Sequence, residues 1–331
     1  MTDQRSIPPV LGRVPPIIAS PHQPAARTWR NRKPSLLSPE ELERYGDLLI
    51  FARSMVEGYF SGKHPSPHPG SSVEFTEYRE YVPGDDVRRM DWRAYGRTRR
   101  LFVRSYESET DMVIYLLVDA SASMSYRGND GPSKYHFAAK IAAALAYLMI
   151  HQGDKAALGL FAETLKLYLT PGGTRPHLHQ LVAELEAADP AFGTGTARAL
   201  QECDTLFKKR GRLVVLSDFW DDRAGIFDAL SRFVHRKFEI LLLQIAHPHE
   251  LDLPAMASAR FHDLESHEEV EVETDEIRAA YRVSARSRVE ELAREADRRR
   301  MQHALVSTQQ PYLDAIEAYL GFRGLNTWSS R

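Results

Sequence analysis

The sequence predicts an α/β protein built on a doubly wound, mostly parallel, Rossmann-like sheet, with a small β-rich appendage on its amino-terminal side. Two observations support this prediction. Beyond residue 112, short apolar runs alternate with amphipathic segments, the order typical of parallel strands joined by helices. The first of these runs, residues 112–118, is apolar almost throughout, as expected for a strand that is covered on both faces.

The remaining elements of the predicted sheet follow from the same alternation. Residues 135–150 place Ala138, Ile141, Leu145 and Leu148 on one stripe, which predicts an amphipathic helix. Further strands are predicted at residues 156–161, 165–169, 213–216, 240–245 and 303–307. Further helices are predicted at residues 177–187, 197–207, 224–234, 277–300 and 311–320.

The chain divides into four parts by composition. Residues 1–37 hold many prolines and few large aliphatic side chains, so we expect a flexible arm. Residues 38–109 should form an amino-terminal helix, which begins near Ser38 and stops at Gly58, followed by a β-rich segment. The sheet domain should occupy residues 110–325, and residues 326–331 form a tail.

Composition narrows the functional classes. The chain has 331 residues, 43% hydrophobic and 27% charged, with a formal net charge of -2. That charge gives no overall field for nucleic acid or an anionic membrane. The single cysteine, Cys203, cannot form an internal disulfide, and no apolar stretch is long enough to span a bilayer. We therefore expect a cytoplasmic protein.

Oxygen-bearing side chains cluster at predicted strand ends. Asp119 directly follows the first strand, Ser121 and Ser123 lie in the loop after it, and Asp218 follows the strand at 213–216. Thr194 precedes another helix. Because ligands bind beyond the carboxyl ends of parallel strands, these groups could meet there. An all-oxygen set suits Mg²⁺, with Mn²⁺ and Ca²⁺ as alternatives, although such residues also serve as ordinary turn and cap residues.

Taken together, these residues resemble a known motif. Asp119-x-Ser121-x-Ser123, then Thr194, then Asp218 resembles the metal-ion-dependent adhesion site of von Willebrand factor type A domains. The upstream residues are similar to those of the family labelled domain of unknown function 58. They include Glu74-Phe75, Arg79, Tyr81-Val-Pro83-Gly84-Asp85-Asp86, Arg88 and Asp91-Trp92-Arg93. Roughly residues 70–325 share this resemblance.

The resemblance implies a von Willebrand factor type A-like fold and a non-enzymatic, Mg²⁺-dependent protein-interaction module. Such a module accepts an Asp or Glu from its partner, and in bacteria the family often stands beside MoxR-type AAA+ ATPases. Asp119, Ser121 and Ser123 would be ligands from the first loop, and Asp218 a direct or water-mediated one. Thr194 is preferred to Thr196 because it has the family's spacing to Ala199-Leu200. Tyr95-Gly96 depart from the Ser-Ala of many relatives.

Two alternatives remain open. Seven arginines between Arg88 and Arg104, interleaved with aromatic residues, could bind nucleic acid through phosphates and stacking, although neighbouring acidic residues could pair with them. A metal-dependent hydrolase would need a general base within reach of the Asp119 cluster, and His136 or His151 could serve as one. Both histidines fall on a predicted helix, where a packed or solvated histidine is commoner.

Overall fold

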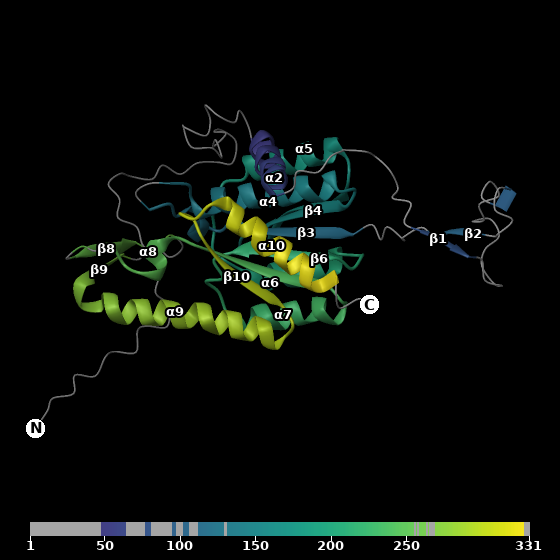
Figure 1. Ribbon diagram of the computed structural model, residues 1–331. Coiled ribbons are helices and arrows are strands. Elements are labelled where there is room, and N and C mark those ends of the chain that lie inside the picture. The colour runs from purple at the N-terminus through teal and green to yellow at the C-terminus, as the bar shows by residue number, and fades with distance from the viewer. Residues whose placement is uncertain are drawn as a thin grey trace, which may run out of the picture. The chain divides into compact units, whose positions relative to one another are not determined.

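The computed structural model describes residues 48–63, 77–80, 95–96, 102–105, 112–128, 131–254, 256, 258–262, 264 and 269–327. These residues form two compact units, and the smaller one lies within residues 61–112. The larger unit holds the central sheet and the helices that cover it (Figure 1).

The sheet of the larger unit has six strands in the order β10-β7-β6-β3-β4-β5. All neighbouring pairs are parallel except β4 and β5. The strands are β3 (Val113–Asp119), β4 (Lys155–Phe161), β5 (Leu165–Gly172), β6 (Arg212–Ser217), β7 (Glu239–Ala246) and β10 (Gln302–Ser307). The predicted mixed α/β fold with a mostly parallel sheet is confirmed.

The side of the sheet on which successive strands are added changes at β3. From β3 it proceeds to β4 and β5 on one side, and then returns to place β6 on the other side. The carboxyl ends of β3 and β6 therefore flank the point where the strand order switches. Loops diverge at such a point, which makes it the expected ligand site of an open α/β sheet.

Strand β3 shows how the sheet is buried on both faces. Ile114, Leu116 and Val118 belong to one apolar cluster, whereas Tyr115 and Leu117 belong to the other. This alternation follows from the two-residue period of a strand. The first face is covered by α2 (Leu48–Lys63), α4 (Lys134–His151), α5 (Arg175–Ala187) and α10 (Tyr312–Thr327); the second is covered by α6 (Thr196–Leu206), α7 (Arg223–His235) and α9 (Thr274–Arg298) (Figure 1).

Helix α2 packs on the core of the larger unit through Leu48, Phe51, Ala52 and Val56. The predicted stop at Gly58 is wrong, because α2 continues to Lys63. Gly58 is exposed in the helix, and nothing lies within 4 Å of the position that a Cβ would take. Helical glycine costs only about 1 kcal/mol relative to alanine, which the packing of the apolar face can offset. The part of this predicted helix before residue 48 lies outside the described residues.

Two short antiparallel strand pairs lie outside the central sheet. In the smaller unit, β1 (Glu77–Glu80) pairs with β2 (Phe102–Ser105). In the larger unit, β8 (Ala259–His262) pairs with β9 (Glu269–Val272), after the short helix α8 (Pro248–Leu251). Within the described ranges, no helix combines the length and the apolar character that crossing a membrane requires.

Candidate functional site

The candidate site begins where β3 and β6 end side by side. Asp119 is the last residue of β3, Ser217 is the last residue of β6, and Asp218 follows directly. The register pairs Val118 with Leu216, which brings the two strand ends level with one another. The structure thus brings together the two aspartates that the sequence predicted at strand ends.

Asp119 is fully buried, and both of its carboxylate oxygens accept hydrogen bonds. Oδ1 accepts from the backbone N–H of Ser121 at 2.9 Å, and Oδ2 accepts from the hydroxyl of Ser217 at 2.6 Å. Burial and repulsion from the nearby Asp218 carboxylate raise the pKa of Asp119 to about 7, although these hydrogen bonds act in the opposite direction. A cation beside Asp119 would stabilise its ionised form.

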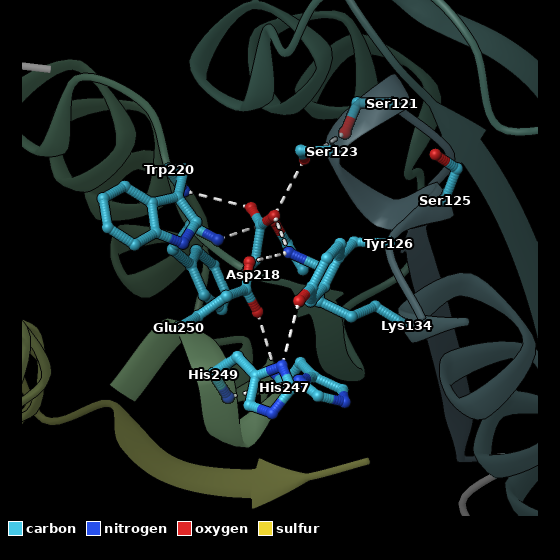
Figure 2. A network of polar contacts seen from close by, with 12 residues as sticks. Ser121, Ser123, Ser125, Tyr126, Lys134, Asp218, Trp220, His247, His249 and Glu250 are labelled. Atoms are coloured by element: carbon cyan, nitrogen blue, oxygen red, sulfur yellow. Dashed lines mark hydrogen bonds and ion pairs between the residues drawn. The ribbon is translucent and has the colours of Figure 1, made fainter. Parts of the chain in front are cut away.

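The hydroxyl groups of the first loop join Asp119 to Asp218. Ser121 Oγ lies 3.1 Å from Ser123 Oγ, which donates to Asp218 Oδ2 at 2.8 Å (Figure 2). The other Asp218 oxygen, Oδ1, accepts from the backbone N–H of Trp220 at 3.1 Å. Ser123 belongs to the 3₁₀ helix η2 (Ala122–Ser125), whose tight turn directs the hydroxyl back to the strand ends. Four of the five predicted ligands therefore form one contiguous buried group.

Lys134 supplies a buried positive charge that was not predicted from the sequence. Its ammonium donates to Asp218 Oδ2 at 2.7 Å and to Glu250 Oε1 at 2.5 Å, and all three side chains are at least 98% buried (Figure 2). Burial by itself lowers the pKa of Lys134, but the carboxylates of Asp218 and Glu250 outweigh that effect and raise it. Burial raises the pKa of Glu250, and the Lys134 ammonium opposes this rise. Lys134 thus links the end of β6 to α8.

The sequence gives only weak indications that Lys134 and Glu250 belong to the site. Lys134 stands in the first turn of α4, after the N-cap Ser133, where the helix dipole disfavours a cation. Glu250 follows β7, whose carboxyl end lies beside that of β6. A lysine at an unfavourable helix start and a glutamate after the next strand were the only available indications.

Thr194, the fifth predicted ligand, is half-buried in the loop before α6. This loop is held against the first loop, because the N–H of Ala122 donates to Phe192 O at 2.8 Å and that of Ala191 donates to Ala120 O at 3.0 Å. Thr196 is fully buried at the start of α6, and its hydroxyl has no hydrogen-bond partner among the described residues. The structure places the Thr194 loop beside the site, and the choice between the two threonines stays a prediction.

The donor set of the site fits a hard divalent cation. Asp119, Asp218, Ser121 and Ser123 offer only carboxylate and hydroxyl oxygens, the ligands that Mg²⁺ prefers. If Asp119, Asp218, Glu250 and Lys134 are all ionised, the buried group carries two more negative than positive charges, so one divalent ion balances it. Within the described ranges, His, Cys, Asp and Glu side chains form no group of three or more suited to a metal, so the hydroxyls would have to contribute.

The alternative sites are only partly described. Most of the segment from Arg88 to Arg104, the proposed nucleic-acid patch, lies outside the described residues, as do most of the upstream family residues. His136, the first candidate general base, shares a 2.6 Å hydrogen bond with the hydroxyl of Ser133 at the start of α4. His151 is exposed in the last turn of α4.

Comparison with known proteins gives a family. A family described as "Protein of unknown function DUF58" matches residues 77–291. The uncharacterized proteins Rv1480 of Mycobacterium tuberculosis and Mb1516 of Mycobacterium bovis are each 30% identical over 226 residues, which cover 66% of this chain and 69% of theirs. A crystal structure of the conserved hypothetical protein BatB from Bacteroides thetaiotaomicron is 15% identical, with a TM-score of 0.45, and covers 64% of this chain and 99% of that chain. The chain belongs to the DUF58 family.

Proposed function

We propose that the larger unit is a von Willebrand factor type A-like domain that binds one Mg²⁺ ion and uses it to recognise another protein. Its ligands would come from Asp119, Ser121, Ser123, Thr194 and Asp218, in the manner of a metal-ion-dependent adhesion site. The observation that carries this proposal is the buried group of carboxylates and hydroxyls at the switch point between β3 and β6.

Electrostatics supports an ion at this place. Burying an ionised carboxylate is costly unless it is paired, and Lys134 is the one buried cation that contacts the group within the described residues. The pair of Lys134 with Asp218 and Glu250 leaves Asp119 without an ionic partner in that group. A divalent ion held by the serine hydroxyls and an aspartate would meet this need, and Mn²⁺ or Ca²⁺ could replace Mg²⁺ with a different affinity.

Recognition rests on the charge of the ligands. Ser121, Ser123 and Thr194 are neutral, so an ion that is coordinated directly by only one of the two aspartates keeps part of its positive charge and attracts an Asp or Glu from a partner. The proposed ligands Asp119, Ser121, Ser123 and Asp218 are at most 1% exposed, so the partner's carboxylate reaches the ion only when a surrounding loop shifts. This proposed activity is binding without catalysis, and a MoxR-type AAA+ ATPase is the proposed partner.

The test is a binding measurement with a purified, nucleotide-free MoxR-type ATPase from the same organism. The wild-type chain should bind in MgCl₂ and lose binding in EDTA, and Asp218→Ala should fail to bind in either. Asp228→Ala, which removes an exposed carboxylate from α7, serves as the matched control and should bind like the wild type. Binding that persists in EDTA and in Asp218→Ala would contradict the proposal.

A further inference from the structure

Phe192 is an exposed aromatic residue with an unfavourable backbone conformation. Its side chain is 47% exposed, and its φ of 71° lies in the left-handed region. Bulky side chains rarely adopt that region, because the Cβ then crowds the backbone. A glycine would adopt the same φ without this cost. The phenyl ring therefore contributes something other than the shape of its own loop.

The main chain of Phe192 is hydrogen-bonded to the loop after β3, which carries the proposed ligands Ser121 and Ser123. The carbonyl of Phe192 accepts from the N–H of Ala122, and the neighbouring Ala191 N–H donates to Ala120 O. Ala120 and Ala122 flank Ser121, one of the proposed ligands. The ring lies beside the ammonium of Lys166, which is 4.7 Å from its centroid. Phe192 is thus fixed at the edge of the proposed cation site.

A groove of about 270 Å³ opens beside Phe192. Its walls come from the ends of β3 and β4, from β5, and from the end of α5. They are mainly small or aliphatic: Ala120, Leu160, Ala162, Leu167, Ala187, Ala188 and Ala191. Lys166 and Glu184 add one charge of each sign, so the groove favours neither anions nor cations. Its chemistry suits an apolar side chain.

We propose that Phe192 and this groove receive a protein segment in which a large apolar residue stands next to the Asp or Glu that reaches the cation. The inference rests on the proposed function, because the divalent ion sets the need for an acidic residue. Ala120 lines the groove and directly follows Asp119 in the chain, so the groove adjoins the loop that carries the proposed ligands. Aromatic residues near the centre of a protein interface commonly contribute much of its binding energy.

Two capped peptides test the inference, Ac-Gly-Leu-Asp-Leu-Gly-amide and Ac-Gly-Ser-Asp-Ser-Gly-amide. They carry the same aspartate and differ only in its neighbours. Each is titrated into the ¹⁵N-labelled full chain in MgCl₂, and amide shifts at Ala188, Ala191 and Gly193 report binding. The leucine peptide should bind about tenfold more tightly than the serine peptide, as burial of one aliphatic side chain predicts.

Three variants make the test specific. Phe192→Gly relieves the backbone strain, so it should keep the Tm at or above that of the wild type while losing the preference for leucine. Ala187→Trp fills the groove from an exposed position and should lose the same preference. Leu206→Ala removes an exposed apolar side chain at the end of α6 and should keep it.

Equal affinities of the wild type for the two peptides, or a leucine preference that survives in Phe192→Gly, would overturn the inference. A calorimetric titration of Mg²⁺ into the wild-type chain, freed of divalent ions beforehand, separates the two proposals. If Mg²⁺ binds and the leucine preference is absent, the docking groove is wrong and the cation site stands. If Mg²⁺ does not bind and the leucine preference still depends on Phe192, the groove stands and the proposed cation function fails.

Discussion

The ammonium of Lys134 lies 2.7 Å from Oδ2 of Asp218, and both side chains are buried almost completely. The same Asp218 oxygen accepts a hydrogen bond from Ser123, so the lysine and the proposed ligand loop share one carboxylate. Lys134 and Ser123 therefore hold the Asp218 carboxylate in one orientation.

Lys134→Met should lower the free energy of unfolding by about 3–5 kcal/mol, because Asp218 and Glu250 are then left buried without a counter-ion. Mg²⁺ should recover more stability in this variant than in the wild type, since the site is then more negative. Urea denaturation with and without MgCl₂ measures both effects. Arg198→Ala breaks an exposed pair with Glu202 and should change stability by less than about 1 kcal/mol. Similar losses in both variants would contradict the buried role of Lys134.

Gly195→Ala should destabilise the protein by about 1–3 kcal/mol, the usual cost of forcing extra volume into a packed site. A Cβ at Gly195 would lie 2.2 Å from the backbone oxygen of Glu163, so the loop that carries Thr194 has to move. Mg²⁺ affinity should fall with it. Gly321→Ala is the control, because nothing lies within 4 Å of its Cβ position in α10. Alanine should raise the free energy of unfolding there by about 0.5–1 kcal/mol. If both variants were less stable than the wild type, or both more stable, the proposed contact of Gly195 with the backbone of Glu163 would be contradicted.

His303 should make stability depend on pH. Burial lowers the pKa of His303 from 6.5 to about 4, and its Nε2 lies 3.0 Å from Gln244 Oε1. Below about pH 6.5 the His303 imidazole is protonated in the unfolded chain but stays neutral in the folded protein. The contribution of His303 to the free energy of unfolding is therefore complete above that pH and is lost as the pH falls towards 4. The loss approaches about 3 kcal/mol.

His303→Gln keeps a hydrogen-bonding group beside Gln244 but cannot titrate. Its free energy of unfolding should therefore fall less between pH 7 and pH 4.5 than that of the wild type, by urea titration at each pH. His179, an exposed residue on α5, provides the control variant His179→Gln, which should follow the wild type. Parallel pH profiles for the wild type and His303→Gln would show that His303 is not responsible.

The aspartates and serines of the site could be predicted from the sequence because each follows a recognisable strand. Residues 112–118 and 213–216 are continuous apolar runs, and the observed strands β3 and β6 differ from them by no more than one residue at either end. Since parallel strands carry their loops at one edge, Asp119 and Asp218 had to lie close if the two strands were neighbours. The apolar runs were therefore sufficient to predict most of the sheet, and the aspartates and serines that follow two of its strands.

Lys134, Glu250 and the end of α2 could not be predicted in the same way. The bridge from Lys134 to Glu250 joins residues 116 positions apart and exists only because β6 and β7 are adjacent. Gly58 locally suggests a helix stop, but α2, which packs on the core through residues up to Val56, continues past it to Lys63. Strands β8 and β9 have four residues each, too short for a clear alternation.

A calorimetric titration of Mg²⁺ into the wild-type chain and into Asp119→Ala tests the central claim most directly. The wild type should bind one ion per chain, and Asp119→Ala should show no binding heat while its circular dichroism spectrum still reports the folded sheet. Asp228→Ala should bind like the wild type. An absence of Mg²⁺ binding in the wild type, or unchanged binding in folded Asp119→Ala, would contradict the account.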